Sequence, residues 1–199
     1  MARDATLTRA RLIRAGERRF AEDGIRGARL ADIVRDAGQG NDSAVGYHFG
    51  SRQGLLRAIV ERHLAEMDRR RALPPDGAGL RTVVAGIVEP TAELLRTDEG
   101  RDFLRIMEQV SDWSGLGSGR PNPVLDGTVL AAQLGALSSL LVSEVGPVLA
   151  RERAALLVTF LTGALAERAR SRSAGTRQRL GHEKFVVHLV DVLSAALSA

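Results

Sequence analysis

The sequence predicts an all-α protein with two domains. Apolar residues recur three or four positions apart along most of the 199 residues, as they do on one face of a helix. The alternation of apolar and polar residues that marks a strand is scarce. There is no cysteine, which excludes disulfides and thiolate metal sites. We expect a domain over 1–72 built on three helices and closed by a fourth, longer one, a helical bundle of five segments over 73–199, and about nine helices in all.

The first helix of the N-terminal domain is expected to end at Asp23-Gly24. Thr6 or Thr8 could cap its start, because a hydroxyl oxygen can accept from a free backbone N–H there. A short helix follows over 30–37, with Leu30 and Ile33 on its apolar side.

A tight turn at 37–40 separates this helix from a second short one. Asn41 or Asp42 could cap the second helix, which covers about 42–48. Phe49-Gly50 then interrupts the pattern, and Ser51 caps a longer helix that closes the domain.

The segment 73–79 is rich in proline and glycine and marks the domain boundary. Five helical segments are expected beyond it, over about 80–95 with a kink at Pro90, then 100–114, 124–145, 148–170 and 182–198. A glycine-rich loop at 114–123 separates the second from the third.

Charge is unevenly distributed. Residues 1–73 hold 15 arginines against 10 acidic residues, whereas the rest of the chain is nearly neutral. Arginine holds phosphate in two-point geometry, so this third of the chain suits an anionic partner. A solvated charged surface is the alternative explanation.

Residues 28–48 form a helix, a glycine-bearing turn and a second short helix, which is the helix-turn-helix pattern. In such motifs the second helix enters the major groove of DNA. Small residues at Ala37-Gly38 allow the two helices to cross, and Val45 and Phe49 can face inward. Many all-α proteins also contain two short helices around a glycine, so this pattern alone leaves both interpretations open.

The run Ser43-Ala44-Val45-x-Tyr47-His48-Phe49-Gly50-Ser51-Arg52-x-Gly54-Leu55-Leu56, behind Gly24, Leu30, Ile33 and Ala37-Gly38, resembles the DNA-binding domain of the tetracycline-repressor (TetR) family. The resemblance covers about residues 6–66. It implies a homodimeric transcription regulator, most often a repressor, whose C-terminal domain binds a small molecule and forms the dimer. The chain departs from the family at Arg29, where Ser or Thr is common, and at Gly46.

The motif and the resemblance together predict the residues that contact double-stranded DNA at a pseudo-palindromic operator. Short polar or small residues at the start of the second helix would meet base edges, and Tyr47, His48 and Arg52 would hold phosphates. The full set is Arg29, Gln39, Asn41, Asp42, Ser43, Ala44, Gly46, Tyr47, His48 and Arg52.

The segments 154–166 and 185–197 are apolar over a wide arc, so each needs cover on two sides. A second copy of the chain is the simplest cover, and burial within one subunit is the alternative. The expected dimer residues are Leu157, Phe160, Leu161, Leu165, Phe185, Leu189 and Val192.

A pocket for a small, largely apolar effector is expected within 80–145. Its candidate walls are Leu94, Phe103, Leu104, Met107, Val110, Trp113, Leu134 and Leu137, although helical spacing favours ordinary core over ligand contact for each of them. Gln109 and Gln133 could orient the ligand or lie on the surface. Binding would move the helix after residue 80 against the helix of 52–71 and so change the separation of the two DNA-binding domains.

Nothing in the sequence predicts an enzyme, a cofactor or a metal site. His182 and His188 are six apart rather than four, and His63-x-x-Glu66 lacks a third ligand. No run of 18 apolar residues is present, so we expect a cytoplasmic protein with no membrane partner. The rival interpretation is an all-α ligand-binding or scaffold dimer that has lost operator binding, which Gly46 and Asp42 support.

Overall fold

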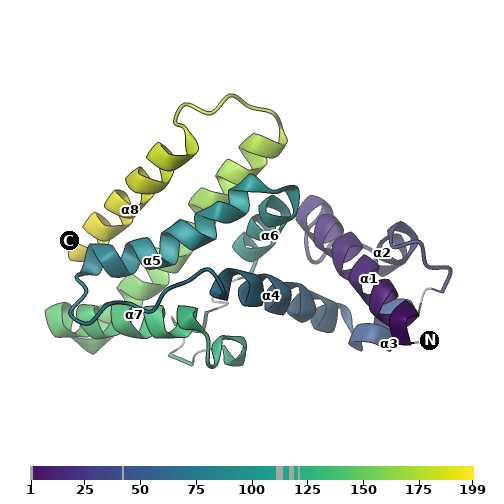
Figure 1. The fold of residues 1–199 in the computed structure, drawn as a ribbon, viewed down its shortest axis with the longest axis horizontal. Coiled ribbons are helices and arrows are strands. Elements are labelled where there is room, and N and C mark those ends of the chain that lie inside the picture. The colour runs from purple at the N-terminus through teal and green to yellow at the C-terminus, as the bar shows by residue number, and fades with distance from the viewer. Residues whose placement is uncertain (1, 42, 111–113, 117–118, 121) are drawn as a thin grey trace.

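The computed structural model describes residues 2–41, 43–110, 114–116, 119–120 and 122–199. Within these ranges it contains eight α-helices, two short 3-10 helices and no strand, which confirms the all-α prediction. Helices α1 to α3 gather at one end of the molecule, and α5, α7 and α8 form the other, with α4 and α6 between them (Figure 1).

The N-terminal helices follow the sequence pattern closely. Their bounds are Ala2–Asp23 for α1, Leu30–Asp36 for α2, Ala44–Phe49 for α3 and Arg52–Asp68 for α4. Helix α1 begins well before Thr6, so neither predicted threonine caps it. Asp4 lies in its first turn, where a carboxylate favours the positive end of the helix dipole.

Positive backbone φ angles explain two of the breaks. Gly24 has φ 82° directly after α1, and Gly38 has φ 67° after α2, a region that side chains with a Cβ rarely adopt. Beyond Gly38 the backbone N–H of Gln39 donates to the carbonyl of Val34 at 3.0 Å, which closes the end of α2. The expected cap at Ser51 is present, because its hydroxyl accepts from the Gly54 N–H at 3.1 Å.

The C-terminal domain contains α5 (Leu80–Ala92), the 3-10 helix η1 (Glu93–Arg96), α6 (Asp98–Glu108), the 3-10 helix η2 (Pro123–Leu125), α7 (Val129–Ser173) and α8 (His182–Ser198). Pro90 lies inside α5, and the helix tightens into η1 shortly afterwards. Helix α6 ends earlier than the expected residue 114.

Helix α7 joins two segments that the sequence separates at 146–147. Gly146 lies between them with φ 78° and ψ 167°, a conformation that only glycine adopts readily. Counting the two arms separately gives nine α-helical segments within the described residues, in agreement with the predicted number.

Within the described residues α7 is also the one helix long and apolar enough, by length and composition, to pass a test for a membrane span. The break at Gly146 argues against that role. The arm before it would extend about 26 Å at 1.5 Å per residue, less than the ~30 Å hydrocarbon thickness of a bilayer.

Candidate nucleic-acid interface

One side of α3 is exposed and its other side is buried. Val45 packs into the domain core, as predicted, with the partly buried Phe49 beside it. Ser43, Gly46 and Tyr47 face solvent, and Tyr47 is 84% exposed. Helix α3 lies at the end of the molecule remote from α5 and α8 (Figure 1), and its side that carries Gly46 and Tyr47 is exposed. The shape therefore permits insertion into a groove.

The chain is held in a defined conformation as it enters α3. The side-chain Oδ1 of Asn41 accepts from the Ser43 backbone N–H at 2.9 Å, and the Ala44 N–H donates to the Asn41 carbonyl at 3.0 Å. A Cβ built on Gly46 would meet nothing within 4 Å, so no packing within the chain requires glycine there. Glycine leaves the backbone accessible at the middle of the exposed side.

Two predicted DNA contacts have roles inside the domain instead. Ala44 is buried and belongs to the core, so it is not available to base edges. The Arg52 guanidinium donates from Nη1 to the carbonyls of Ile25 and Ala28, each at 2.6 Å. These carbonyls belong to the loop after α1, and a cation pinned to them serves the fold rather than a phosphate.

The other predicted DNA contacts are variously exposed. Arg29 is exposed at the start of α2 but gives α2 no side-chain cap. Gln39 and His48 are half-buried, and the His48 ring lies edge-on to Tyr47 with centroids 5.0 Å apart. Asp42 lies outside the described residues.

Arg9 of α1 is a further candidate that the sequence analysis did not name. Its guanidinium carbon stands 5.1 Å from the centroid of the Phe49 ring, which places an exposed cation beside the end of α3. A sequence window limited to the motif cannot find it, because the two residues are 40 positions apart.

The predicted dimer residues divide into two sets. Leu157, Leu161, Leu165 and Leu189 are buried within the subunit itself. Phe160 and Val192 remain about half exposed, at 52% and 49%. Leu156 of α7 and Val187 of α8 are exposed apolar residues of the same two helices.

Phe185 is covered from within the subunit. The guanidinium carbon of Arg168 lies 4.1 Å from its ring centroid. The surface that a second copy could cover is therefore carried by the outward sides of α7 and α8, and not by the four buried leucines.

An apolar cavity of about 50 Å³ lies between α4 and the C-terminal helices α5, α6 and α7. Four of the predicted wall residues line it: Phe103, Leu104, Met107 and Leu134. Leu94 and Leu137 belong to the surrounding core, Val110 lines a separate open groove, and Trp113 lies outside the described residues.

Sequence reasoning missed the walls that come from outside 80–145. Leu64, Met67 and Arg71 reach the cavity from the end of α4, and Leu161, Thr162 and Leu165 from the second arm of α7. Two of these, Leu161 and Leu165, were expected at the dimer interface. The helical pattern shows that a residue is buried, but it does not show which neighbour buries it.

Helix α6 packs beside a buried hydrogen bond that joins α4 to α1. His63 of α4 is hydrogen-bonded to Glu17 of α1, and both side chains are buried. The His63 ring also stacks on Phe103 of α6, with centroids 4.2 Å apart. His63 therefore pairs with a carboxylate on another helix and not with Glu66, the partner that a metal site would use.

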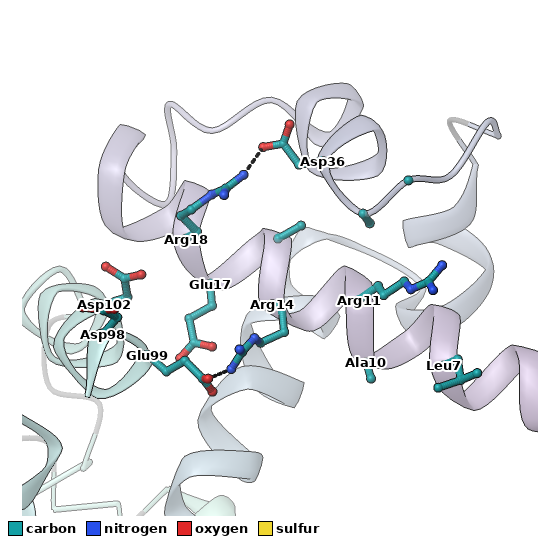
Figure 2. Close-up of a pocket in the computed structure, with 13 residues that line it drawn as sticks. Leu7, Ala10, Arg11, Arg14, Glu17, Arg18, Asp36, Asp98, Glu99 and Asp102 are labelled. Atoms are coloured by element: carbon teal, nitrogen blue, oxygen red, sulfur yellow. Dashed lines mark hydrogen bonds and ion pairs between the residues drawn. The ribbon is translucent and has the colours of Figure 1, made fainter. Parts of the chain in front are cut away.

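Two further contacts join α6 to α1. Gln109 accepts from the Ile25 N–H at 2.9 Å and donates to the Phe20 carbonyl at 3.2 Å, so it binds the end of α1 rather than a ligand. Glu99 pairs with Arg14 across an open, charged groove of about 680 Å³, which also contains the Arg18–Asp36 pair (Figure 2). Phe103 of α6 contacts both the cavity and His63, so α6 links the cavity to α1 and α4.

No family model matches the sequence, and no curated protein matches it either. Solved structures do match the fold over nearly the whole chain. One is assigned to the TetR family of transcriptional regulators and comes from Rhodococcus sp., with a TM-score of 0.61, 16% identity, and coverage of 96% of this chain and 99% of that one.

Two further solved structures support the same fold. NalD, the secondary repressor of the MexAB-OprM multidrug efflux pump in Pseudomonas aeruginosa, matches with a TM-score of 0.59, 17% identity and coverage of 98% and 97%. A transcriptional regulator from Rhodococcus sp. Rha1 matches with a TM-score of 0.56, 18% identity and 95% coverage of both chains. The chain therefore has the fold of these regulators.

Proposed function

We propose that this chain is a DNA-binding transcription regulator of the TetR type, which acts as a homodimer and responds to a small molecule. The observation that carries the proposal is the exposure of Asn41 and Ser43 just before α3 and of Gly46 and Tyr47 on it, while Val45 on the opposite side anchors the helix. Regulation by repression is proposed from the resemblance and from the likeness in fold to NalD.

The electrostatics of the N-terminal domain support a duplex as the partner. The arginine excess of residues 1–73 would attract a polyanion, and Arg9 and Arg29 remain exposed near the two ends of the motif. Phosphate contacts of this kind fix register, while the polar start of α3 would read bases.

The dimer is proposed from the exposed apolar residues of α7 and α8. Two helices from each subunit would form an isologous four-helix interface around Phe160 and Val192. Two copies of α3 could then meet half-sites roughly 34–36 Å apart on one face of a duplex.

The response to a ligand is proposed to pass through α6. A molecule that enlarges the cavity would displace Phe103, and with it the stacking on His63 and the pairing with Glu17 of α1. The sequence instead predicts a movement of α5, the helix after residue 80. We propose α6, because it makes more of the polar contacts to α1. The ligand must prefer one arrangement energetically for the equilibrium to shift.

Selection of bound duplexes from a random DNA pool tests the proposed function. We expect enrichment of an inverted repeat, whose two halves would also report the dimer. Binding to the enriched sequence should weaken steeply as salt rises, because phosphate contacts release counterions. If no sequence is enriched and DNA affinity is low at every salt concentration, the scaffold interpretation replaces this one.

A further inference from the structure

Arg71 is a buried cation at the wall of the apolar cavity. It follows the end of α4 and is only 9% exposed. Its Nη1 donates to the carbonyls of Gly86 at 3.0 Å and Ile87 at 3.3 Å and to Gln133 Oε1 at 3.0 Å, and its Nη2 donates to Thr91 Oγ1 at 2.9 Å. All four acceptors are neutral.

The sequence explains part of this arrangement. Pro90 has no N–H, so the carbonyl four residues before it, that of Gly86, loses its helical partner. Arg71 supplies a donor to that carbonyl. A neutral donor would satisfy it equally well, so the proline kink does not account for a full positive charge.

The charge of Arg71 has no close counter-ion. Among the described residues no carboxylate forms an ion pair with it. The nearest acidic influence is Asp68, whose two oxygens accept from the N–H groups of Val129 and Leu130 at the start of α7. Burial lowers the pKa of Arg71 to about 10, against a smaller opposing effect of Asp68. A buried charge without a partner is costly, and an anion beside it would offset that cost.

The rest of the cavity is apolar, with Leu64, Met67, Phe103, Leu134 and Leu165 around it. Its other polar lining groups are two threonines whose hydroxyls donate to carbonyls of their own helices, Thr91 to Ile87 at 2.7 Å and Thr162 to Val158 at 2.8 Å. Arg71 is therefore the hydrogen-bond donor that this cavity offers to a ligand.

We propose that the cavity binds a small organic acid, with its carboxylate on the Arg71 guanidinium and its apolar body among the leucines and Phe103. This inference rests on the proposed ligand response and specifies its chemistry. The present volume of about 50 Å³ is smaller than the roughly 150 Å³ of a cavity that holds a benzene ring, so a short alkyl chain or a single ring would enter by displacing Phe103 and enlarging the cavity. A hydrogen bond from guanidinium to carboxylate is charge-assisted, and Nη2 has a second hydrogen besides the one donated to Thr91.

Calorimetric titration of the full chain at pH 7.5 tests this with acid and amide pairs of equal shape: butanoate and butanamide, hexanoate and hexanamide, benzoate and benzamide. We expect at least one acid to bind tenfold or more tightly than its amide. If none of the acids exceeds its amide, the inference is wrong.

Variants then assign the preference to Arg71. Arg71→Gln should reduce the acid-over-amide ratio below about twofold, and Arg71→Lys should retain part of it. Thr91→Val, which frees Nη2, should tighten acid binding. Thr82→Val, at an exposed position of α5 that does not line the cavity, should leave the ratio unchanged. A ratio that survives Arg71→Gln contradicts the inference, and Thr91→Val keeps it testable if Arg71→Gln does not fold.

The outcome is separable from that of the proposed function, because acid binding needs no DNA. Acid preference without an enriched operator would leave the cavity assignment standing and remove the regulator proposal. An enriched operator without acid preference would do the reverse.

Discussion

Tyr47 and Arg52 show, at the scale of single residues, where a contact predicted from the sequence agrees with the structure and where it does not. The resemblance places both Tyr47 and Arg52 at the phosphate backbone. In the structure Tyr47 projects into solvent, whereas the Arg52 guanidinium donates to two loop carbonyls at 2.6 Å. A sequence pattern predicts the order of side chains along a helix. It does not predict that Arg52 contacts a loop 24 to 27 positions away.

Exchanging each of these residues for alanine should separate the two roles. We expect Tyr47→Ala to lower affinity for the selected operator about tenfold and to change the free energy of unfolding by less than about 0.5 kcal/mol, as exposed substitutions do. Arg52→Ala should destabilise the fold by about 2 kcal/mol through the lost charged hydrogen bonds. Thermal unfolding and DNA-binding anisotropy measure both. Equal effects of the two variants on stability would contradict the assignment.

Asp102 of α6 gives the molecule a pH dependence. Burial raises its pKa from 3.8 to about 6, Arg105 opposes this, and Glu17 adds to it. Between those two pH values the folded chain holds a proton that the unfolded chain releases, so this group adds stability as pH falls through 6. Above pH 6 the carboxylate is ionised in the folded chain, which lowers the free energy of unfolding.

Asp102→Asn should therefore raise the melting temperature by a few degrees at pH 7.5, where the wild type carries the buried charge. That advantage should shrink towards zero at pH 4.5, because the wild-type carboxyl is then protonated in the folded state. The matched control is Asp76→Asn in the exposed linker, which should show no such trend. An advantage for Asp102→Asn that is constant with pH would show that the carboxyl does not titrate as stated.

At the scale of whole elements, periodicity predicts most of this fold. The breaks at Gly24, Gly38 and 73–79 fall where the sequence places them, since glycine and proline act through local backbone geometry. Errors arise where tertiary contacts decide. Leu161 and Leu165 have the spacing of an outward apolar stripe, yet they face the cavity of their own subunit.

The sequence also predicts one part of the candidate site, the exposed side of α3, but not the walls of the cavity. Local chemistry identifies the exposed side of α3, which needs only the order of small, polar and apolar residues along one short helix. The cavity walls contributed by α4 could not be predicted, because no local signal relates the end of α4 to α5 and α7. Pro90 was the available clue, since its missing N–H requires another donor near Gly86.

The bend of α7 at Gly146 depends on glycine. With φ 78° and ψ 167°, Gly146 occupies a region that costs other residues about 1–3 kcal/mol. Gly146→Ala should therefore destabilise the fold by that amount, although an added Cβ would touch nothing within 4 Å.

Gly135→Ala is the matched comparison, because Gly135 is also open to an added Cβ but lies in the regular part of α7. This change should stabilise by about 0.5–1 kcal/mol. Chemical unfolding of both variants measures the contrast. Stabilisation by both changes would mean that α7 does not bend at Gly146 in solution.

At the scale of the whole molecule, the proposed recognition of DNA would require two copies of α3 at a fixed separation. A single α3 of six residues offers few base contacts, so the second copy must supply much of the affinity through effective concentration. The apolar residues left exposed on α7 and α8 are then as important for operator binding as those on α3, although they lie at the opposite end of the subunit (Figure 1).

Placing a charge in this apolar surface of α7 and α8 should separate the two subunits, and with them the two copies of α3. Phe160→Glu buries a carboxylate in the proposed interface without touching the subunit core, because Phe160 is half exposed in the single chain. We expect a folded monomer by light scattering and a loss of operator affinity of at least a hundredfold. Leu73→Glu, an exposed leucine in the linker, should leave a dimer with full affinity. If Phe160→Glu remains dimeric, the subunits meet through another surface, and the spacing of the two α3 helices must be set there.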